Sequence, residues 1–171
     1  MELKKISKNE YDKYFSLLED DFVLEERKTK EDEFAAFDNQ AFSPNFIYEN
    51  GNLIGYACFW EFDEFVFVEH FAILKKMRGT GCGSRFLKEF SESKNKPIVL
   101  EVELPENEIA KKRISFYERL GYVINPFEYY QPTYHEGLEL VPMHIMTYKN
   151  TLSKEQFDSF VLQIKNLVYN Q

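Results

Sequence analysis

Cysteine is scarce in this sequence, with Cys58 and Cys82 the only two among 171 residues. Two cysteines so spaced form neither a disulfide framework nor a zinc-binding pattern. Cys58 lies in an apolar segment and is expected in the core. Cys82 lies among glycines, where we interpret it as a small residue that fits a loop and not as a nucleophile. The sequence therefore predicts no metal site and no catalytic thiol.

Long apolar runs and basic segments are also lacking. No apolar run reaches the roughly 20 residues of a membrane-spanning helix, and the N-terminus, MELKKISKNE, lacks the apolar centre of a signal peptide. We therefore expect a cytoplasmic protein that does not bind membranes. The formal net charge of −8 argues against nucleic-acid binding, which usually requires a basic surface. This charge mildly favours a cationic substrate, although it also keeps many soluble proteins apart.

Aromatic residues are abundant, with 17 Phe and 11 Tyr, and hydrophobic residues make up 44% of the chain. This composition is typical of a folded globule and not of a disordered chain. The sequence shows no internal repeat, low-complexity tract or linker. At this length we expect a single domain over residues 1–171, which ends in an amphipathic helix over 153–170.

Three of the seven glycines lie at alternate positions, Gly79, Gly81 and Gly83. The segment before them, 65–74, is apolar on both faces, which indicates a strand buried in mid-sheet. One face of this strand is predicted to carry Phe65, Phe67, Phe71 and Ile73. A helix is expected from about Gly83 to Ser93. A strand, a glycine loop and a helix N-terminus together form a cradle for an anion, most often a phosphate.

Three kinds of phosphate-binding loop compete for this segment. A P-loop requires a lysine after its last glycine, which is absent here, so a phosphotransferase is disfavoured. A dinucleotide-binding loop requires a third glycine where Ser84 stands. The spacing from Arg78 to Gly81 and Gly83 fits the pattern [RQ]xxGxG and resembles the pyrophosphate loop of the GNAT superfamily of N-acetyltransferases, which binds acetyl-coenzyme A. The alternative is a turn that only joins strand and helix.

A second motif lies downstream, where residues 116–122 read FYERLGY. This segment resembles the second signature of the same superfamily, and the segments 129–135 and 141–143 look like a bacterial subgroup whose substrates are unknown. Two positions depart from the family pattern. Ala110 stands where many relatives have an asparagine that contacts the cofactor, and Lys75 stands where many have a proline.

The resemblance implies a fold of the α/β (α+β) class. We expect a mixed, mostly antiparallel central sheet of about six or seven strands, splayed between the fourth and fifth strands, with helices on both faces. The expected strands are 1–6, 46–49, 53–62, 65–74, 98–104, 122–124 and 140–148. Five helices are expected. The first follows a capping box at Ser7 and Glu10, and the last follows a second capping box at Ser153 and Gln156. The other three are expected from Thr29 to about Asn39, from 83 to 93 and from 105 to 120.

The resemblance also implies an activity, the transfer of an acetyl group from acetyl-coenzyme A to an amine of an unidentified small molecule or peptide, directly in a ternary complex. In the superfamily the pantetheine arm of this cosubstrate lies along the central strand, which here is the backbone of Phe71 and Ile73, and no metal takes part. The residues expected to bind the pyrophosphate are Arg78, Gly79, Gly81, Gly83 and Ser84.

Two residues are expected to move protons. Glu69 is predicted to share a face with Phe71 and Ile73, where apolar neighbours would raise its pKa and suit it as the base for the amine. A buried glutamate with a structural partner, or a chain of waters as the base, are the alternatives. Tyr117 matches the residue that often protonates the departing thiolate in relatives, the alternative being a core tyrosine. His70 is expected on the other face, in a structural role or at a rim.

The acceptor site is expected in the aromatic connection 125–139 and the charged loop near Glu25. The predicted substrate-binding residues are Tyr129, Tyr130, Tyr134 and His135. The alternative is that these aromatics cover the sheet edge. A different function class also stays open, a non-catalytic sensor or regulatory module that binds acyl-coenzyme A. The C-terminal helix is expected to pack on the domain, with a homodimer contact as the alternative.

Overall fold

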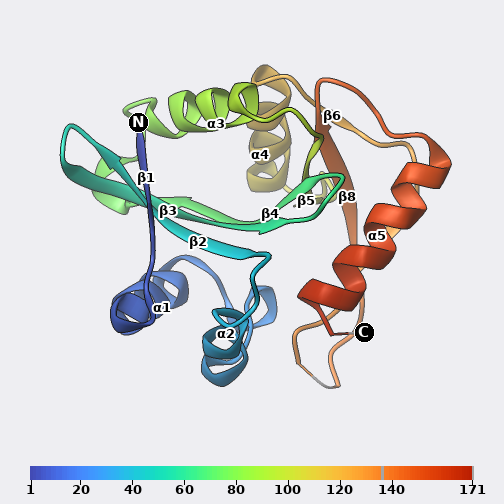
Figure 1. The fold of residues 1–171 in the computed structure, drawn as a ribbon. Coiled ribbons are helices and arrows are strands. Elements are labelled where there is room, and N and C mark those ends of the chain that lie inside the picture. Colours follow the sequence, from blue (N-terminus) through green and yellow to red (C-terminus); the bar gives the residue numbers. More distant parts are fainter. Residues whose placement is uncertain (136, 171) are drawn as a thin grey trace.

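The computed structural model describes residues 1–135 and 137–170, and its strands form one eight-stranded sheet (Figure 1). The strands are β1 (Glu2–Lys5), β2 (Phe42–Glu49), β3 (Asn52–Glu61), β4 (Val66–Ile73), β5 (Ile98–Glu103), β6 (Tyr122–Ile124), β7 (Tyr129–Gln131) and β8 (Val141–Tyr148). Their order is β1-β2-β3-β4-β5-β8-β6, with β7 paired to β8. Among these strands only β4 and β5 pair in parallel. The predicted mixed, mostly antiparallel sheet is thus confirmed.

Helices cover both faces of the sheet (Figure 1). They are α1 (Tyr11–Asp21), α2 (Lys30–Ala36), α3 (Cys82–Ser93), α4 (Glu108–Arg119) and α5 (Lys154–Val168), with short 3₁₀ turns η1 (Lys8–Glu10), η2 (Leu24–Glu26) and η3 (Lys75–Met77). One hydrophobic cluster joins the sheet to α1 and α5, and a second joins it to α3 and α4. The inward face of α5 carries Phe157, Phe160, Ile164 and Val168, so this helix packs on the sheet as predicted.

Capping residues explain where most helices begin. Thr29 accepts the amide of Asp32, and Ser153 forms a capping box with Gln156, both as predicted. The predicted start of α4 at Pro105 is wrong. The Asn107 side chain accepts two amide bonds at 2.9 Å, so the helix begins at Glu108.

Two other predicted boundaries are wrong. The helix α2 ends at Ala36, three residues before the predicted end. The strand β2 begins at Phe42 and not at 46. It runs through Pro44, whose carbonyl accepts the amide of Ile6, the residue after β1, at 2.9 Å.

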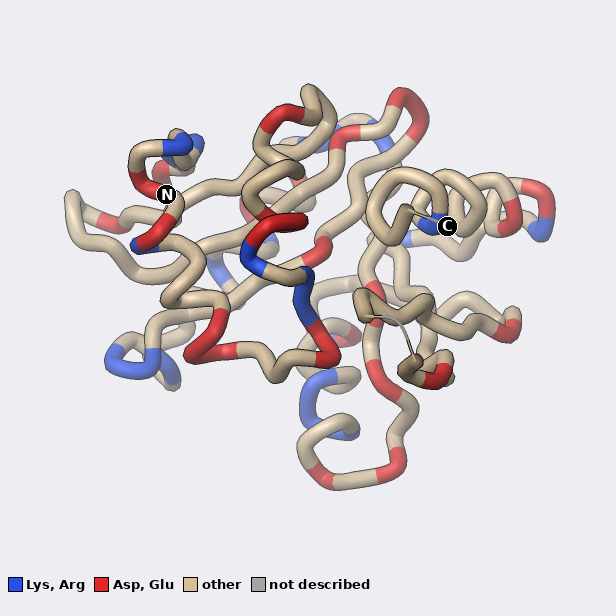
Figure 2. Tube along the Cα trace, turned by 90° about the horizontal axis from the view of Figure 1, so that it is seen from below, with Lys and Arg blue, Asp and Glu red and all other residues tan. Residues whose placement is uncertain are grey.

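Charge is spread over the molecule. Acidic residues lie in most parts of the trace, with basic residues between them (Figure 2). Among the described residues, no helix is long and apolar enough to cross a membrane. The same residues contain no group of three or more His, Cys, Asp or Glu side chains that could hold a metal ion.

The sheet splits between β4 and β5, as predicted. Their ladder contains three pairs and ends where Val68 lies opposite Leu100. Glu69 and Glu101 are therefore the first residues beyond the paired part of each strand. We call this point the fork.

A β-bulge lies in β4 at the fork. Cys58 pairs with His70 and Phe59 with Val68, so Glu69 is left without an opposite residue on β3. An extra residue reverses the alternation of side chains along a strand. Phe67 therefore packs in the cluster with α1 and α5, whereas Phe71 packs against the cluster with α3. The prediction that Phe65, Phe67, Phe71 and Ile73 share one face is wrong for this reason.

Candidate active site

The glycine loop and the start of α3 line a cavity of about 380 Å³, which we call the cradle cavity. Gly79 and Gly81 both have φ of +79°, a conformation that glycine adopts without strain, and Gly81 caps α3, which begins at Cys82 and not at Gly83. All seven residues that the sequence predicts to bind the cofactor line this cavity, namely Phe71, Ile73, Arg78, Gly79, Gly81, Gly83 and Ser84.

The free edge of β4 faces the split in the sheet. The Leu74 amide donates to the Ile54 carbonyl on β3 at 2.9 Å. Amides of a strand alternate between its two edges, so the amides of Phe71 and Ile73 point to the opposite edge, toward β5. The carbonyl of Ile73 accepts from Arg78 Nε at 2.8 Å on that side. The site thus offers backbone donors at one end and a helix N-terminus at the other.

The cradle fits an extended molecule with an anionic end. A Cβ atom at Gly83 would lie 3.1 Å from Ile73 Cγ1, so α3 approaches β4 as closely as glycine allows. The N-terminus of α3 supplies unpaired amides and the positive end of the helix dipole. Arg78 adds a cation at the rim, although it also pairs with Asp21 at 2.5 Å.

A second cavity, of about 310 Å³, lies at the fork and continues the first, since Phe71, Ile73 and Arg78 line both. This fork cavity also contains Tyr117. The Tyr117 ring packs against those of Phe116 and Tyr122, at 5.3 and 5.7 Å between centroids. Burial raises the pKa of Tyr117 to about 12. Its hydroxyl therefore keeps its proton near neutral pH and is available as a donor.

A third cavity, of about 370 Å³, meets the fork cavity at Phe22, Glu69, Glu101 and Arg113. We call it the acidic cavity, because five carboxylates line it against one arginine. These carboxylates are Glu25, Glu26, Glu69, Glu101 and Glu103. Glu103 pairs with Arg113. Burial, and next the charge of Glu103, raise the pKa of Glu26. The cavity therefore favours a cationic ligand.

Glu69 is enclosed by three donors. Its side chain is 1% exposed and forms an ion pair with Lys28. It also accepts from Trp60 Nε1 at 2.6 Å and from the Tyr134 hydroxyl at 3.0 Å. Burial alone would raise the pKa of Glu69, but the positive charge of Lys28 and these hydrogen bonds lower it.

Two sequence-based expectations for Glu69 are therefore wrong. Its pKa is lowered and not raised, because Lys28 folds over it from the charged loop. It also does not share a face with Phe71 and Ile73, because the bulge directs it toward Trp60 and the cluster with α1.

Glu101 is the residue of the fork that sequence reasoning missed. The Tyr129 hydroxyl donates to its Oε1, while Tyr169 and Gln131 donate to its Oε2 at 2.7 and 2.8 Å. Burial raises the pKa of this carboxyl despite these three bonds. A glutamate within the apolar strand 98–104 was the signal available in the sequence.

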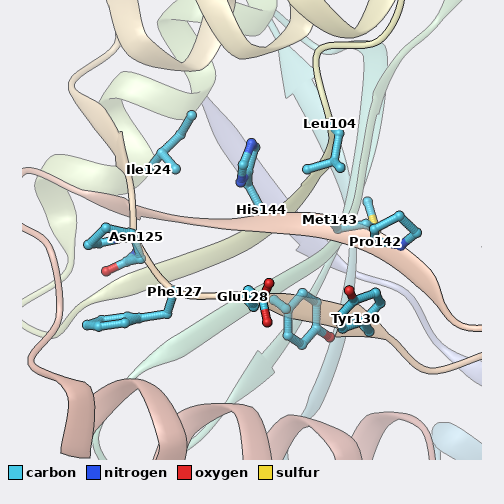
Figure 3. A pocket seen from close by; sticks show the side chains of 11 residues that line it. Leu104, Ile124, Asn125, Phe127, Glu128, Tyr130, Pro142, Met143 and His144 are labelled. Atoms are coloured by element: carbon cyan, nitrogen blue, oxygen red, sulfur yellow. The ribbon is translucent and has the colours of Figure 1, made fainter.

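The four predicted acceptor residues do not gather in one place. Tyr134 lines the acidic cavity, and Tyr129 lies behind it, bonded to Glu101. Tyr130 is 47% exposed and lines a different cavity of about 330 Å³, beside Pro142 (Figure 3). His135 Nε2 bonds to the Leu24 carbonyl at 2.9 Å and ties the connection to η2.

His70 is a second residue that sequence reasoning left out of the site. It is 2% exposed, lines the acidic cavity, and donates from Nε2 to the Glu26 carbonyl at 2.9 Å. Its Nδ1 has no hydrogen-bond partner within the described part of the chain. Burial lowers the pKa of His70, although the charge of Glu69 opposes this. The imidazole is therefore neutral at pH 7.

Comparison with known proteins identifies the family. The model of the acetyltransferase (GNAT) family matches residues 11–122, more than half of the chain. The chain is 34% identical to a solved structure described as "Putative acetyltransferase from GNAT family from Bacteroides thetaiotaomicron", with a TM-score of 0.93 over 100% of this chain and 99% of the other. It is also 41% identical to "Putative acetyltransferase YjbC" of Bacillus subtilis (strain 168), over 63 residues that span 36% of this chain and 32% of the relative.

More distant structures share the fold. Naa50 of Arabidopsis thaliana, solved in complex with the bisubstrate analogue CoA-Ac-MVNAL, is 17% identical with a TM-score of 0.61 over 85% of this chain and 96% of its own. A spermidine N-acetyltransferase of Vibrio cholerae, SpeG, is 13% identical with a TM-score of 0.64 over 86% of this chain and 94% of its own. The family model, the full-length structural match and the motifs at 78–84 and 116–122 agree: this chain belongs to the GNAT family and is an acetyltransferase.

Proposed function

We propose that this protein transfers the acetyl group of acetyl-coenzyme A to an amine by direct transfer in a ternary complex. One observation carries the proposal: the cradle cavity and the acidic cavity meet at the fork. A cosubstrate held along the cradle would bring its thioester to the same point that a cationic acceptor reaches from the other side. Attack by a bound amine requires no enzyme-bound intermediate in this arrangement.

The cosubstrate would be held by backbone and helix dipole. In this proposal the N-terminus of α3, with Gly79, Gly81, Gly83 and Ser84, binds the pyrophosphate, and the side chain of Arg78 adds a charge. The free edge of β4 at Phe71 and Ile73 holds the pantetheine arm. The Ile73 amide then faces the thioester oxygen and stabilises the negative charge that develops there.

The chemistry requires two proton transfers. An alkylammonium must first lose a proton, because only the neutral nitrogen attacks the thioester carbon. The C–N bond then forms, the C–S bond breaks, and the thiolate takes a proton. We propose Tyr117 as the donor of this last proton, since its hydroxyl stays protonated and lines the fork cavity. The tyrosinate recovers its proton from solvent, and the second proton lost by the nitrogen is released there as well.

Glu69 stays the sequence-based hypothesis for the base. Its carboxylate is ionised at neutral pH and adds negative charge at the fork, but a lowered pKa makes a weak proton acceptor. On the acceptor side we further propose Tyr134 at the wall of the acidic cavity, with Tyr129 and His135 as its support. Tyr130 stays a predicted substrate-binding residue at the separate cavity that it lines. We also propose that the whole chain is one domain.

A panel of amines tests the proposed function. The purified protein is incubated with acetyl-coenzyme A and mono-, di- and polyamines, amino acids and peptides, and thiol release is followed with time. Release that depends on both the amine and the protein is expected, with cationic acceptors preferred. If the protein is instead a non-catalytic sensor, calorimetry should show tight binding of coenzyme A, and no amine should cause thiol release.

A further inference from the structure

The fork holds two carboxylates, one on each separating strand. Glu69 follows the last paired residue of β4, and Glu101 follows the last one of β5 before the split. Both line the fork cavity and the acidic cavity. An amine that comes from the acidic cavity toward a thioester in the fork would therefore pass both carboxylates.

The two carboxylates differ in what neutralises them. Glu69 pairs with a cation, the buried Lys28, whose Nζ also lies 5.4 Å from the Trp60 ring centroid and 4.9 Å from that of Tyr134. Glu101 accepts only from neutral groups, two tyrosine hydroxyls and one amide. No lysine or arginine within residues 1–135 and 137–170 pairs with it. Glu101 thus carries an unbalanced charge at the junction of the cavities.

Glu101 also keeps room for a ligand. A carboxylate has about four acceptor positions, and three are occupied, one on Oε1 and two on Oε2. The free position on Oε1 suits an N–H donor. The residue keeps part of its surface exposed and lines both cavities, so a ligand in either cavity can approach it.

We propose that Glu101 binds the ammonium group of the acceptor and takes its proton. The ammonium gives one proton to a carboxylate oxygen of Glu101, and the nitrogen lone pair then attacks the thioester carbon. The proton leaves Glu101 for solvent through the acidic cavity. In this assignment Glu69 with Lys28 is a fixed neutral pair that positions Tyr134. The inference rests on the proposed function and names the acceptor as a primary amine that is cationic in solution.

The directions of the two pKa values agree with this division of roles. Burial raises the pKa of Glu101, and the charge of Glu69 raises it further, whereas Lys28 lowers that of Glu69. A base is most effective when its pKa approaches the working pH. Other titratable and polar groups contact Glu101 or line the cavities that it lines. They are Asp21 on α1, Glu25 and Glu26 on η2, His70 on β4, Arg78 after η3, Glu103 on β5, Arg113 and Tyr117 on α4, Tyr129 and Gln131 on β7, Tyr134 in the connection and Tyr169 after α5.

The first test is Glu101→Gln in an enzyme that is active with an amine from the panel. Turnover at saturating acceptor is expected to fall about a hundredfold or more, as general base catalysis usually contributes. The acidic limb of the turnover–pH profile, which is the decrease of turnover as the pH falls, should disappear in this variant. The control is Glu128→Gln, an exposed carboxylate next to Tyr129 that lines the cavity of Figure 3, which should keep the wild-type profile. A wild-type limb in Glu101→Gln would overturn the assignment.

Two further variants keep Glu101 and should shift the acidic limb of the profile in opposite directions. Tyr169→Phe removes a hydrogen bond that favours the ionised carboxyl, so the limb should shift to higher pH. Glu69→Gln removes a neighbouring negative charge, so the limb should shift to lower pH while turnover persists. If Glu69 were the base, Glu69→Gln would instead abolish the limb and most of the turnover.

Failure of the inference differs from failure of the proposed function. A wild-type protein that releases no thiol with any amine speaks against the function, whereas an active wild type with an unmoved limb in all variants speaks against Glu101. A second measurement does not depend on turnover. The ¹³C carboxyl signal of Glu101, identified by its loss in Glu101→Gln, is followed by NMR as the pH is varied. Its midpoint should rise in Tyr169→Phe and fall in Glu69→Gln, and a midpoint that moves in neither variant would overturn the proposal.

Discussion

Tyr117 lies one helical turn after Arg113 on α4, and both line the fork cavity. Burial raises the pKa of Tyr117 and so keeps its hydroxyl protonated, while the positive charge of Arg113 lowers this pKa in part. A hydroxyl with these properties keeps its proton until negative charge develops beside it, as on a departing thiolate within hydrogen-bond reach. The acid role that we propose for Tyr117 therefore depends on its surroundings as much as on its identity.

The substitution Tyr117→Phe tests this role. Turnover is expected to fall about a hundredfold at every pH below the hydroxyl's pKa of about 12, since no proton remains to give. Affinity for coenzyme A, measured by calorimetry, should change little. Tyr122→Phe is the matched control, because that hydroxyl bonds to Ser91 in the core at 2.8 Å and not in the cavity. Equal turnover in the two variants would remove Tyr117 from the mechanism.

At the scale of elements, the loop between η3 and α3 sets the position of the amides that we propose to bind phosphate. Gly81 is in the left-handed region directly before the helix, so its φ aims the first free amides of α3. A β-branched residue tolerates this conformation poorly. The cradle is thus a property of backbone geometry, which a side chain at Gly81 would disturb.

Gly81→Val is expected to weaken coenzyme A binding at least tenfold, because the loop must leave its left-handed conformation. Gly51→Val is the matched control, since Gly51 has φ of +76° in the β2–β3 turn, where an added Cβ atom would meet no described atom within 4 Å. Both variants should lose a similar amount of stability in a urea titration, and only Gly81→Val should lose affinity. Equal affinities in a calorimetric titration would contradict the cradle assignment.

Elements that depend on local signals could be predicted from the sequence. The caps at Thr29 and Ser153 and the glycine loop use residues a few positions apart. The site depended on contacts between distant segments. Lys28 and Glu69 are 41 positions apart, and Glu101 and Tyr169 are 68 apart. The bulge at Glu69 and the strand β7 likewise arise from pairing with other strands, which periodicity along one strand does not reveal.

At the scale of the whole molecule, the buried Glu33 links stability to pH. It is 0% exposed and accepts from the Tyr14 hydroxyl at 2.6 Å, while its Oε2 has no partner among the described residues. Burial, together with the charge of Glu69, raises the pKa of Glu33 from 4.5 to about 7. Between these values the folded protein holds a proton that the unfolded chain releases. The free energy of unfolding should therefore fall as the pH rises through this window.

Glu33→Gln removes this penalty, since glutamine resembles the protonated carboxyl. The variant is expected to gain on the wild type by up to about 1.4 kcal/mol for each pH unit between 4.5 and 7, and to show no advantage below pH 4.5. Urea denaturation at pH 5 and pH 8 measures the difference. Glu31→Gln, an exposed position on the same helix, serves as the control and should follow the wild type. A constant difference at both pH values would show that Glu33 does not titrate in this range.

The segment after α5 reaches back into the fork. Tyr169 directly follows α5, its hydroxyl bonds to Glu101, and its ring lies 4.8 Å from that of Tyr134. A change that displaces this segment would therefore withdraw one of the three hydrogen bonds of Glu101 and one aromatic neighbour of Tyr134. The packing of α5 on the sheet and the surroundings of the fork are in this way linked.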